Sequence, residues 1–143
     1  MSNEFLPTPA TIVALKAIVV HNGKALIVQR ADGETYSGQW EFVGGKLEFG
    51  EDLEVALRRE VHEEAGLEVT QSKLLYATSF MPHATKHVVF LTYLCEVVSD
   101  SVVLSAEHQA FEWANVARLR EMLLQPILDG LDSNNAWGAM NLG

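Results

Sequence analysis

The 143-residue sequence has little cysteine, few basic residues and no long apolar segment. Its single cysteine, Cys95, has no partner for an intramolecular disulfide, which excludes a disulfide-stabilised secreted fold. Cys95 lies in an apolar, strand-like run, where we expect a buried free thiol. A reducing, cytoplasmic location is therefore expected.

No segment has the composition of a membrane-spanning or secretory element. The apolar stretch 12–20 has only nine residues and is interrupted by Lys16, whereas a spanning helix needs about 20 apolar residues. The first four residues, Met-Ser-Asn-Glu, lack both the basic start and the apolar core of a signal peptide. We therefore expect no membrane partner.

Basic side chains are scarce relative to acidic ones. Ten Lys and Arg residues stand against 19 Asp and Glu residues, a net charge of −9. Nucleic-acid polymers and anionic membranes both require basic surface, so neither is an expected partner. The length and the 48% apolar content suit one core, and we expect a single domain over residues 1–143.

The pattern along the chain predicts an α+β fold. β-Branched runs around His21-Asn22-Gly23 predict a hairpin. Apolar residues at every fourth position predict a helix over 52–65 with one apolar stripe: Leu53, Leu57, Val61 and Ala65. A second helix is expected over 116–131, with Pro126 kinking or breaking it, and residues 132–143 are expected to be irregular. The expected strands are 11–20, 25–29, 39–43, 74–80, 86–98 and 109–113. Strands on both sides of one helix favour a mixed sheet between helices.

The predicted helix 52–65 carries an unusual concentration of carboxylates. Glu60, Glu63 and Glu64 span roughly 100° of its surface, and Glu64 projects toward the buried side. Anions in this position are costly unless a cation neutralises them, and oxygen ligands favour Mg²⁺ or Mn²⁺. An ordinary surface helix with a solvated acidic face is the alternative. Glycines on both flanks argue against it, because they indicate a shaped loop: Gly44, Gly45, Gly50 and Gly66.

The run from Gly45 to Leu67 resembles the signature of the Nudix hydrolases. The matching positions are Gly45, Glu51, Arg59, Glu60, Val61, Glu63, Glu64, Gly66 and Leu67. The resemblance implies an α/β/α sandwich with a mixed central sheet. It also implies Mg²⁺-dependent cleavage of a phosphoanhydride bond in a nucleoside diphosphate linked to another group, with Mn²⁺ as a substitute metal. Many members are dimers, and a homodimer is left open.

The same resemblance implies roles for the residues of the metal site. Glu60 and Glu64 would be the principal ligands, with Glu63 in or beside the coordination sphere. Gly44 would add a backbone carbonyl, and Glu51 would reach the metal through water. Arg59 would orient the glutamates. Two candidates for the general base stay open: Glu60, preferred here, and Glu107, an acid just before the short strand that ends at Trp113.

The run 38–46 resembles the corresponding stretch of MutT-type nucleoside triphosphate pyrophosphohydrolases. It departs from that stretch at Val43, where those enzymes usually have proline. By this resemblance we expect cleavage of a nucleoside triphosphate, ordinary or oxidised, to the monophosphate and pyrophosphate. The expected substrate contacts are Arg30, Phe42, Lys46 and Gln125.

Two other readings of the sequence remain open. Pro82 follows Leu67 by fifteen residues, a spacing found in some ADP-ribose pyrophosphatases, although a proline also suits a hairpin turn. Dinucleotide substrates belong to the same alternative. A non-catalytic metal-nucleotide sensor is the alternative of a different class. The intact signature counts against it.

Overall fold

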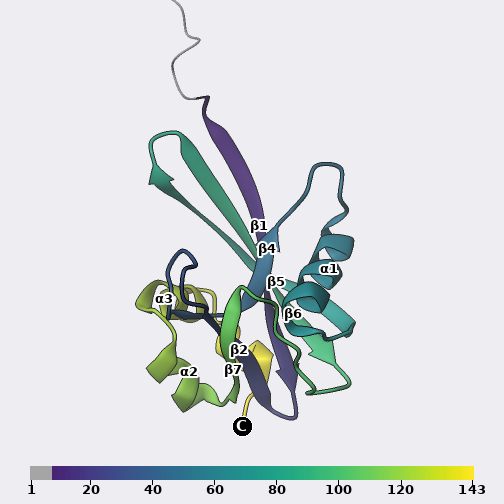
Figure 1. Ribbon diagram of the computed structural model, residues 1–143. Coiled ribbons are helices and arrows are strands. Elements are labelled where there is room, and N and C mark those ends of the chain that lie inside the picture. Colours follow the sequence, from purple (N-terminus) through teal and green to yellow (C-terminus); the bar gives the residue numbers. More distant parts are fainter. Residues whose placement is uncertain (1–7) are drawn as a thin grey trace, which may run out of the picture.

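The computed structural model describes residues 8–143, and these form one mixed β-sheet with helices on both of its faces (Figure 1). The strands are β1 (Ala10–His21), β2 (Lys24–Arg30), β3 (Trp40–Glu41), β4 (Val43–Lys46), β5 (Val69–His83), β6 (Lys86–Val97) and β7 (His108–Ala114). The helices are α1 (Leu53–Ala65), α2 (Val116–Met122), α3 (Gln125–Ser133) and α4 (Ala136–Met140).

The sheet is mixed because one of its pairings is parallel. The strand order is β3-β2-β1-β6-β5, with β4 also paired to β1 and β7 to β2. Strands β1 and β6 run parallel over their whole length, and the other pairs are antiparallel. The short β4, which contains Gly44 and Gly45, therefore lies beside the middle of β1 and leads through residues 47–52 to the start of α1.

Two hydrophobic cores, one on each face, complete an α/β/α sandwich. Alternate residues of β1 and β2 enter different cores, as expected for strands buried on both sides. The first core packs α1 against the sheet, and the second packs α2, α3 and α4 against the opposite face. The predicted fold class is confirmed.

The first hairpin forms as predicted, whereas the second is longer than predicted. Asn22 and Gly23 both have positive φ, 50° and 74°, which matches the primed turn that an Asn-Gly pair favours. Strand β5 begins five residues before the expected start at 74 and continues through Pro82 to His83. The turn therefore lies at residues 84–85 and not at 81–84. The β5–β6 hairpin extends away from the helices in Figure 1.

The prediction for the C-terminal region was confirmed in one respect and wrong in another. The expected helix 116–131 is broken, as Pro126 indicated, but the break lies at Leu123 and Leu124, where the chain is extended, and Pro126 occupies the first turn of α3. Proline is favoured there, where its missing N–H costs no helical hydrogen bond. Residues 132–143, expected to be irregular, contain the end of α3 and all of α4, and Ala136 and Met140 are buried in the second core.

Cys95 is a buried free thiol, as predicted, and burial raises its pKa to about 12. None of the helices within residues 8–143 is long and apolar enough to cross a membrane. The prediction about the first four residues lies outside the described residues. The single domain over residues 1–143 stays a prediction.

Candidate metal and phosphate site

Helix α1 is fixed at both ends, and this sets the direction of its acidic face. Asp52 caps the start by accepting a hydrogen bond from the Glu54 N–H at 2.9 Å. Gly66 closes the end in the left-handed conformation that glycine adopts without strain. The buried side of the helix carries Ala56, Leu57, Val61, Glu64 and Ala65, whereas Leu53, expected on this apolar stripe, is exposed.

Glu64 is the one acidic residue of α1 that is buried in the described structure; it is only 7% exposed. Its Oε2 accepts a hydrogen bond from the Gly44 N–H at 2.9 Å, which links the helix to β4. Burial raises the pKa of Glu64 well above its usual range, and the negative charges of Glu60 and Glu107 add to this effect. A carboxylate held in this way would be stabilised as an anion by a cation at its other oxygen.

The two glycines of β4 allow the strand to approach both β1 and α1 closely. A Cβ on Gly44 would overlap the backbone carbonyl of Leu15, and a Cβ on Gly45 would overlap the Glu60 carboxylate. Glycine is therefore required at Gly44, where the overlapping atom belongs to the backbone, whereas a side chain at Gly45 would displace the Glu60 carboxylate. The Gly44 contact with β1 is structural, whereas the Gly45 contact directly shapes the acidic site.

Arg59 connects the carboxylates around the exposed edge of the site. It donates two hydrogen bonds to Glu51, at 2.7 and 2.9 Å, one to Glu60 at 2.8 Å and one to Glu63 at 3.3 Å. The hydrogen bonds from Arg59 are the largest influence on the Glu51 carboxyl and lower its pKa to about 2. In this structure Glu51 is therefore engaged with Arg59. The geometry suits Arg59 to orienting the glutamates.

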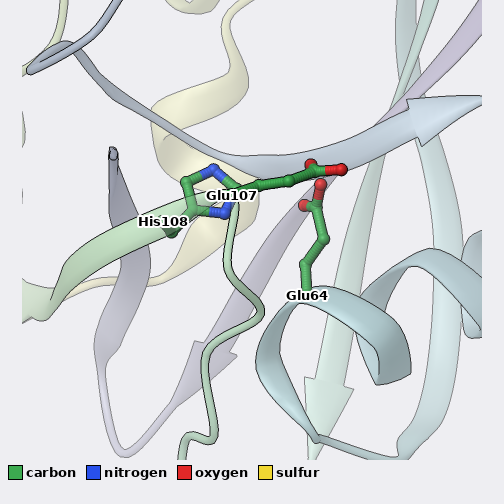
Figure 2. Close-up of side chains that lie close together, drawn as sticks. All are labelled: Glu64, Glu107 and His108. Carbon is green, nitrogen blue, oxygen red and sulfur yellow. The ribbon is translucent and has the colours of Figure 1, made fainter. Parts of the chain in front are cut away.

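Glu107 reaches the same place from the segment that precedes β7. One oxygen each from Glu64 and Glu107 and one ring nitrogen of His108 lie within 4.8 Å of one another. Figure 2 shows the Glu64 and Glu107 carboxylates side by side. Burial raises the pKa of Glu60, and the charge of Glu107 contributes to that increase. The structure thus brings Glu107 beside Glu64 and near enough to Glu60, 47 positions away in the sequence, for their charges to interact.

The predicted substrate residues lie in different environments. Arg30 is paired with Glu41 at 3.0 Å, and Lys46 is exposed at the end of β4. Phe42 is 3% exposed and packs in the second core, so it offers almost no surface on which a nucleobase could stack. We therefore do not propose it as a substrate contact. Gln125 is exposed at the start of α3, where its amide donates to Asp129 at 2.8 Å.

A second polar cluster, centred on Glu41, was missed by the sequence interpretation. The Glu41 carboxylate contacts Lys16 at 3.3 Å, Arg30 at 3.0 Å and the His108 Nε2 at 2.9 Å. A usable signal was present: Lys16 is a lone cation within an apolar strand, and such a charge needs a partner. Burial opposes ionisation of Glu41, but His108, Lys16 and Arg30 outweigh it and lower the pKa to about 2.

We predict that Glu41→Gln lowers the free energy of unfolding by about 2 kcal/mol at pH 7. A carboxyl whose pKa is lowered on folding contributes stability above its unfolded pKa of about 4.5 and loses it as pH falls toward 2. The difference between variant and wild type should therefore shrink between pH 4.5 and pH 2. Urea titrations over this range measure it, and a pH-independent difference would contradict the ionised state of Glu41.

Comparison with known proteins supports the assignment that the site suggests. The family profile described as NUDIX domain matches residues 11–131. The chain is 31% identical over 115 residues to the CTP pyrophosphohydrolase of Escherichia coli K12, covering 80% of this chain and 84% of that protein. It is 32% identical over 129 residues to a MutT-like protein of Streptomyces ambofaciens, covering 87% and 79% of the two chains.

A solved structure agrees with these sequence relationships. The crystal structure of the MutT protein from Methanosarcina mazei Go1 superposes with a TM-score of 0.78 at 25% identity. The match covers 92% of this chain and 96% of that one. The matched region contains α1 with its complete signature, the glycine strand β4 and the sheet that positions them. The chain therefore belongs to the Nudix hydrolase family, as a MutT-like pyrophosphohydrolase.

Proposed function

We propose that the protein hydrolyses a nucleoside triphosphate, ordinary or oxidised, to the monophosphate and pyrophosphate in a Mg²⁺-dependent reaction. The observation that carries the proposal is that Glu64 and Glu107 lie together beside Gly44, with Glu60 against Gly45 and near enough for its charge to act on both. The similarity to a CTP pyrophosphohydrolase supports the triphosphate as substrate class. The anionic site would receive the phosphates through its cations.

The residues have the following proposed roles. Glu60 and Glu64 bind the metal, with Glu63 at the exposed edge and the Gly44 carbonyl as a further ligand. Arg59 holds Glu60 in place and, through Glu51, the loop before α1. Glu51 would affect the metal through Arg59 or through water. When bound, Mg²⁺ would neutralise phosphate charge and make a bound water more nucleophilic.

Two carboxylates are candidates for the base that accepts the proton from the attacking water. Glu60 is half-buried, which raises its pKa and makes it the better proton acceptor, and Arg59 holds it in place at 2.8 Å. Glu107, in contrast, is exposed. We propose Glu60 as the base and Glu107 as a residue that contacts the metal site. Arg30 and Lys46 are further proposed contacts to the substrate, and Gln125 is the proposed contact to its nucleobase. The proposed setting is the cytoplasm, where the substrate is a free nucleotide.

The test is a hydrolysis screen with Mg²⁺ in which the products are identified. The panel comprises ordinary and oxidised nucleoside triphosphates, ADP-ribose, NADH, dinucleoside polyphosphates and nucleotide sugars. We expect a triphosphate to give monophosphate and pyrophosphate, with turnover lost in EDTA and restored by Mg²⁺. Cleavage of ADP-ribose or a dinucleotide alone would contradict the substrate class. Metal-dependent nucleotide binding without turnover would indicate a sensor.

A further inference from the structure

His108, the first residue of β7, has one ring nitrogen with a partner and one without. Its side chain is fully buried, and Nε2 lies 2.9 Å from Oε2 of Glu41. Nδ1 has no hydrogen-bond partner within residues 8–143. A buried polar atom without a partner is rare in native proteins and points to a missing ligand.

The contact with Glu41 determines which form of the imidazole faces the site. Because Glu41 is held as an anion by Lys16, Arg30 and His108 itself, it acts as an acceptor, so Nε2 carries the proton. In a neutral imidazole, Nδ1 then presents a lone pair. Figure 2 shows the nitrogen next to Cγ, which is Nδ1, on the side of the ring that faces Glu64.

With His108 neutral and both carboxylates ionised, as a bound cation would require, three acceptors converge with no donor among them. One ring nitrogen of His108 and one oxygen each of Glu64 and Glu107 lie within 4.8 Å of one another. Two ligands on opposite sides of a cation, each with a bond of about 2.1 Å, are about 4.2 Å apart. Small side-chain movements would therefore bring all three ligand atoms within bonding distance of one cation. Oε2 of Glu64 already accepts from the Gly44 N–H, which leaves Oε1 available.

We propose that His108 Nδ1 is a metal ligand, together with Glu64 and Glu107, in a mixed nitrogen-oxygen site that favours Mn²⁺ over Mg²⁺. The arrangement of Glu41, His108 and the cation is the carboxylate-histidine-metal pattern, in which the second ring nitrogen donates to a carboxylate. Imidazole nitrogen is a better ligand for transition metals than for Mg²⁺. The inference rests on the metal site of the proposed function and names its nitrogen donor.

The direct test is pulsed electron paramagnetic resonance of the full chain with one equivalent of Mn²⁺. Wild type should show the ¹⁴N modulation of a coordinated imidazole. His108→Gln should lose it, and His83→Gln, a control at an exposed histidine near the tip of the β5–β6 hairpin, should keep it. Bound Mn²⁺ without nitrogen modulation in the wild type would overturn the proposal, and this measurement requires no variant.

Metal affinity supplies a second measurement. His108→Gln should weaken Mn²⁺ binding at least tenfold and Mg²⁺ binding by less, because only Mn²⁺ gains from the nitrogen. Glu41→Gln keeps the imidazole but weakens its anchor, and we expect about a tenfold loss of Mn²⁺ affinity. Equal losses of both metals in His108→Gln would contradict a ligand role. Calorimetric titration and a thermal melt of each variant provide these values.

The two proposals fail in different ways. Mg²⁺-dependent triphosphate hydrolysis combined with absent nitrogen modulation would remove His108 from the metal site and leave the proposed function intact. Nitrogen-coordinated Mn²⁺ in a protein that hydrolyses none of the screened nucleotides would support the His108 site and overturn the proposed function.

Discussion

Glu64→Gln is expected to lower Mg²⁺-dependent turnover at least a hundredfold. The amide oxygen of glutamine can still accept the Gly44 N–H, so the link between α1 and β4 is kept. What is lost is the negative charge of the buried glutamate of the site, where solvent cannot replace a metal ligand. Glu60→Gln should cause a comparable loss, because it removes a second carboxylate from the same cluster.

The same substitution should leave the fold intact. Without metal, the Glu64 carboxylate is disfavoured by burial and by the charges of Glu60 and Glu107. A neutral glutamine avoids both the burial of a charge and the repulsion from those neighbours. We expect the melting temperature of metal-free Glu64→Gln to equal or exceed that of wild type. Glu121→Gln, at an exposed residue of α2, is the matched control and should alter neither property. Unchanged turnover in both Glu60→Gln and Glu64→Gln would contradict the metal site.

Gly44→Ala should lower stability, whereas Gly45→Ala should lower turnover, although the two residues are neighbours. At Gly44 the added methyl group would meet the Leu15 backbone carbonyl, which cannot move without disturbing the β1–β4 pairing. We expect a loss of about 3 kcal/mol in the free energy of unfolding. At Gly45 the methyl group would meet the Glu60 carboxylate, the flexible end of a side chain. Stability should change little, and turnover should fall at least tenfold because Glu60 is displaced.

Urea unfolding and steady-state kinetics separate the two effects. Gly138→Ala is the control, because a Cβ there meets no atom within 4 Å and the residue lies in α4, away from the acidic cluster. It should leave turnover unchanged and stability equal or slightly higher, since alanine is the better helix former. A large loss of stability in Gly45→Ala would show that its glycine serves the fold and not the position of Glu60.

Local patterns in the sequence were sufficient to predict the first hairpin and the acidic helix. Asn22-Gly23 matches a specific turn geometry, and the spacing of Leu57, Val61 and Ala65 defines one buried face. Glu64 could be placed toward the interior because its position follows from the same helical period. These features depend on residues a few positions apart, and such relationships can be read from the sequence alone.

Features that depend on packing were predicted poorly. Helix α4 follows from docking against the second core, because the chain there has weak helical signals of its own. The break expected at Pro126 lies slightly earlier, at Leu123 and Leu124. The predicted contact of Phe42 with substrate did not allow for its burial beneath the C-terminal helices. Alternation along a strand shows that two faces differ, but it does not show which partner covers each face.

The sequence by itself determined the family, the acidic helix and the class of chemistry, because the signature is contiguous and its spacing alone places the carboxylates. Only the tertiary structure decided how His108 and Glu107 meet Glu64 and how Glu41 meets His108. Glu41 and His108 are 67 positions apart, and their contact exists because β2 pairs with both β3 and β7. Such a convergence depends on strand register, which no local pattern of these residues specifies.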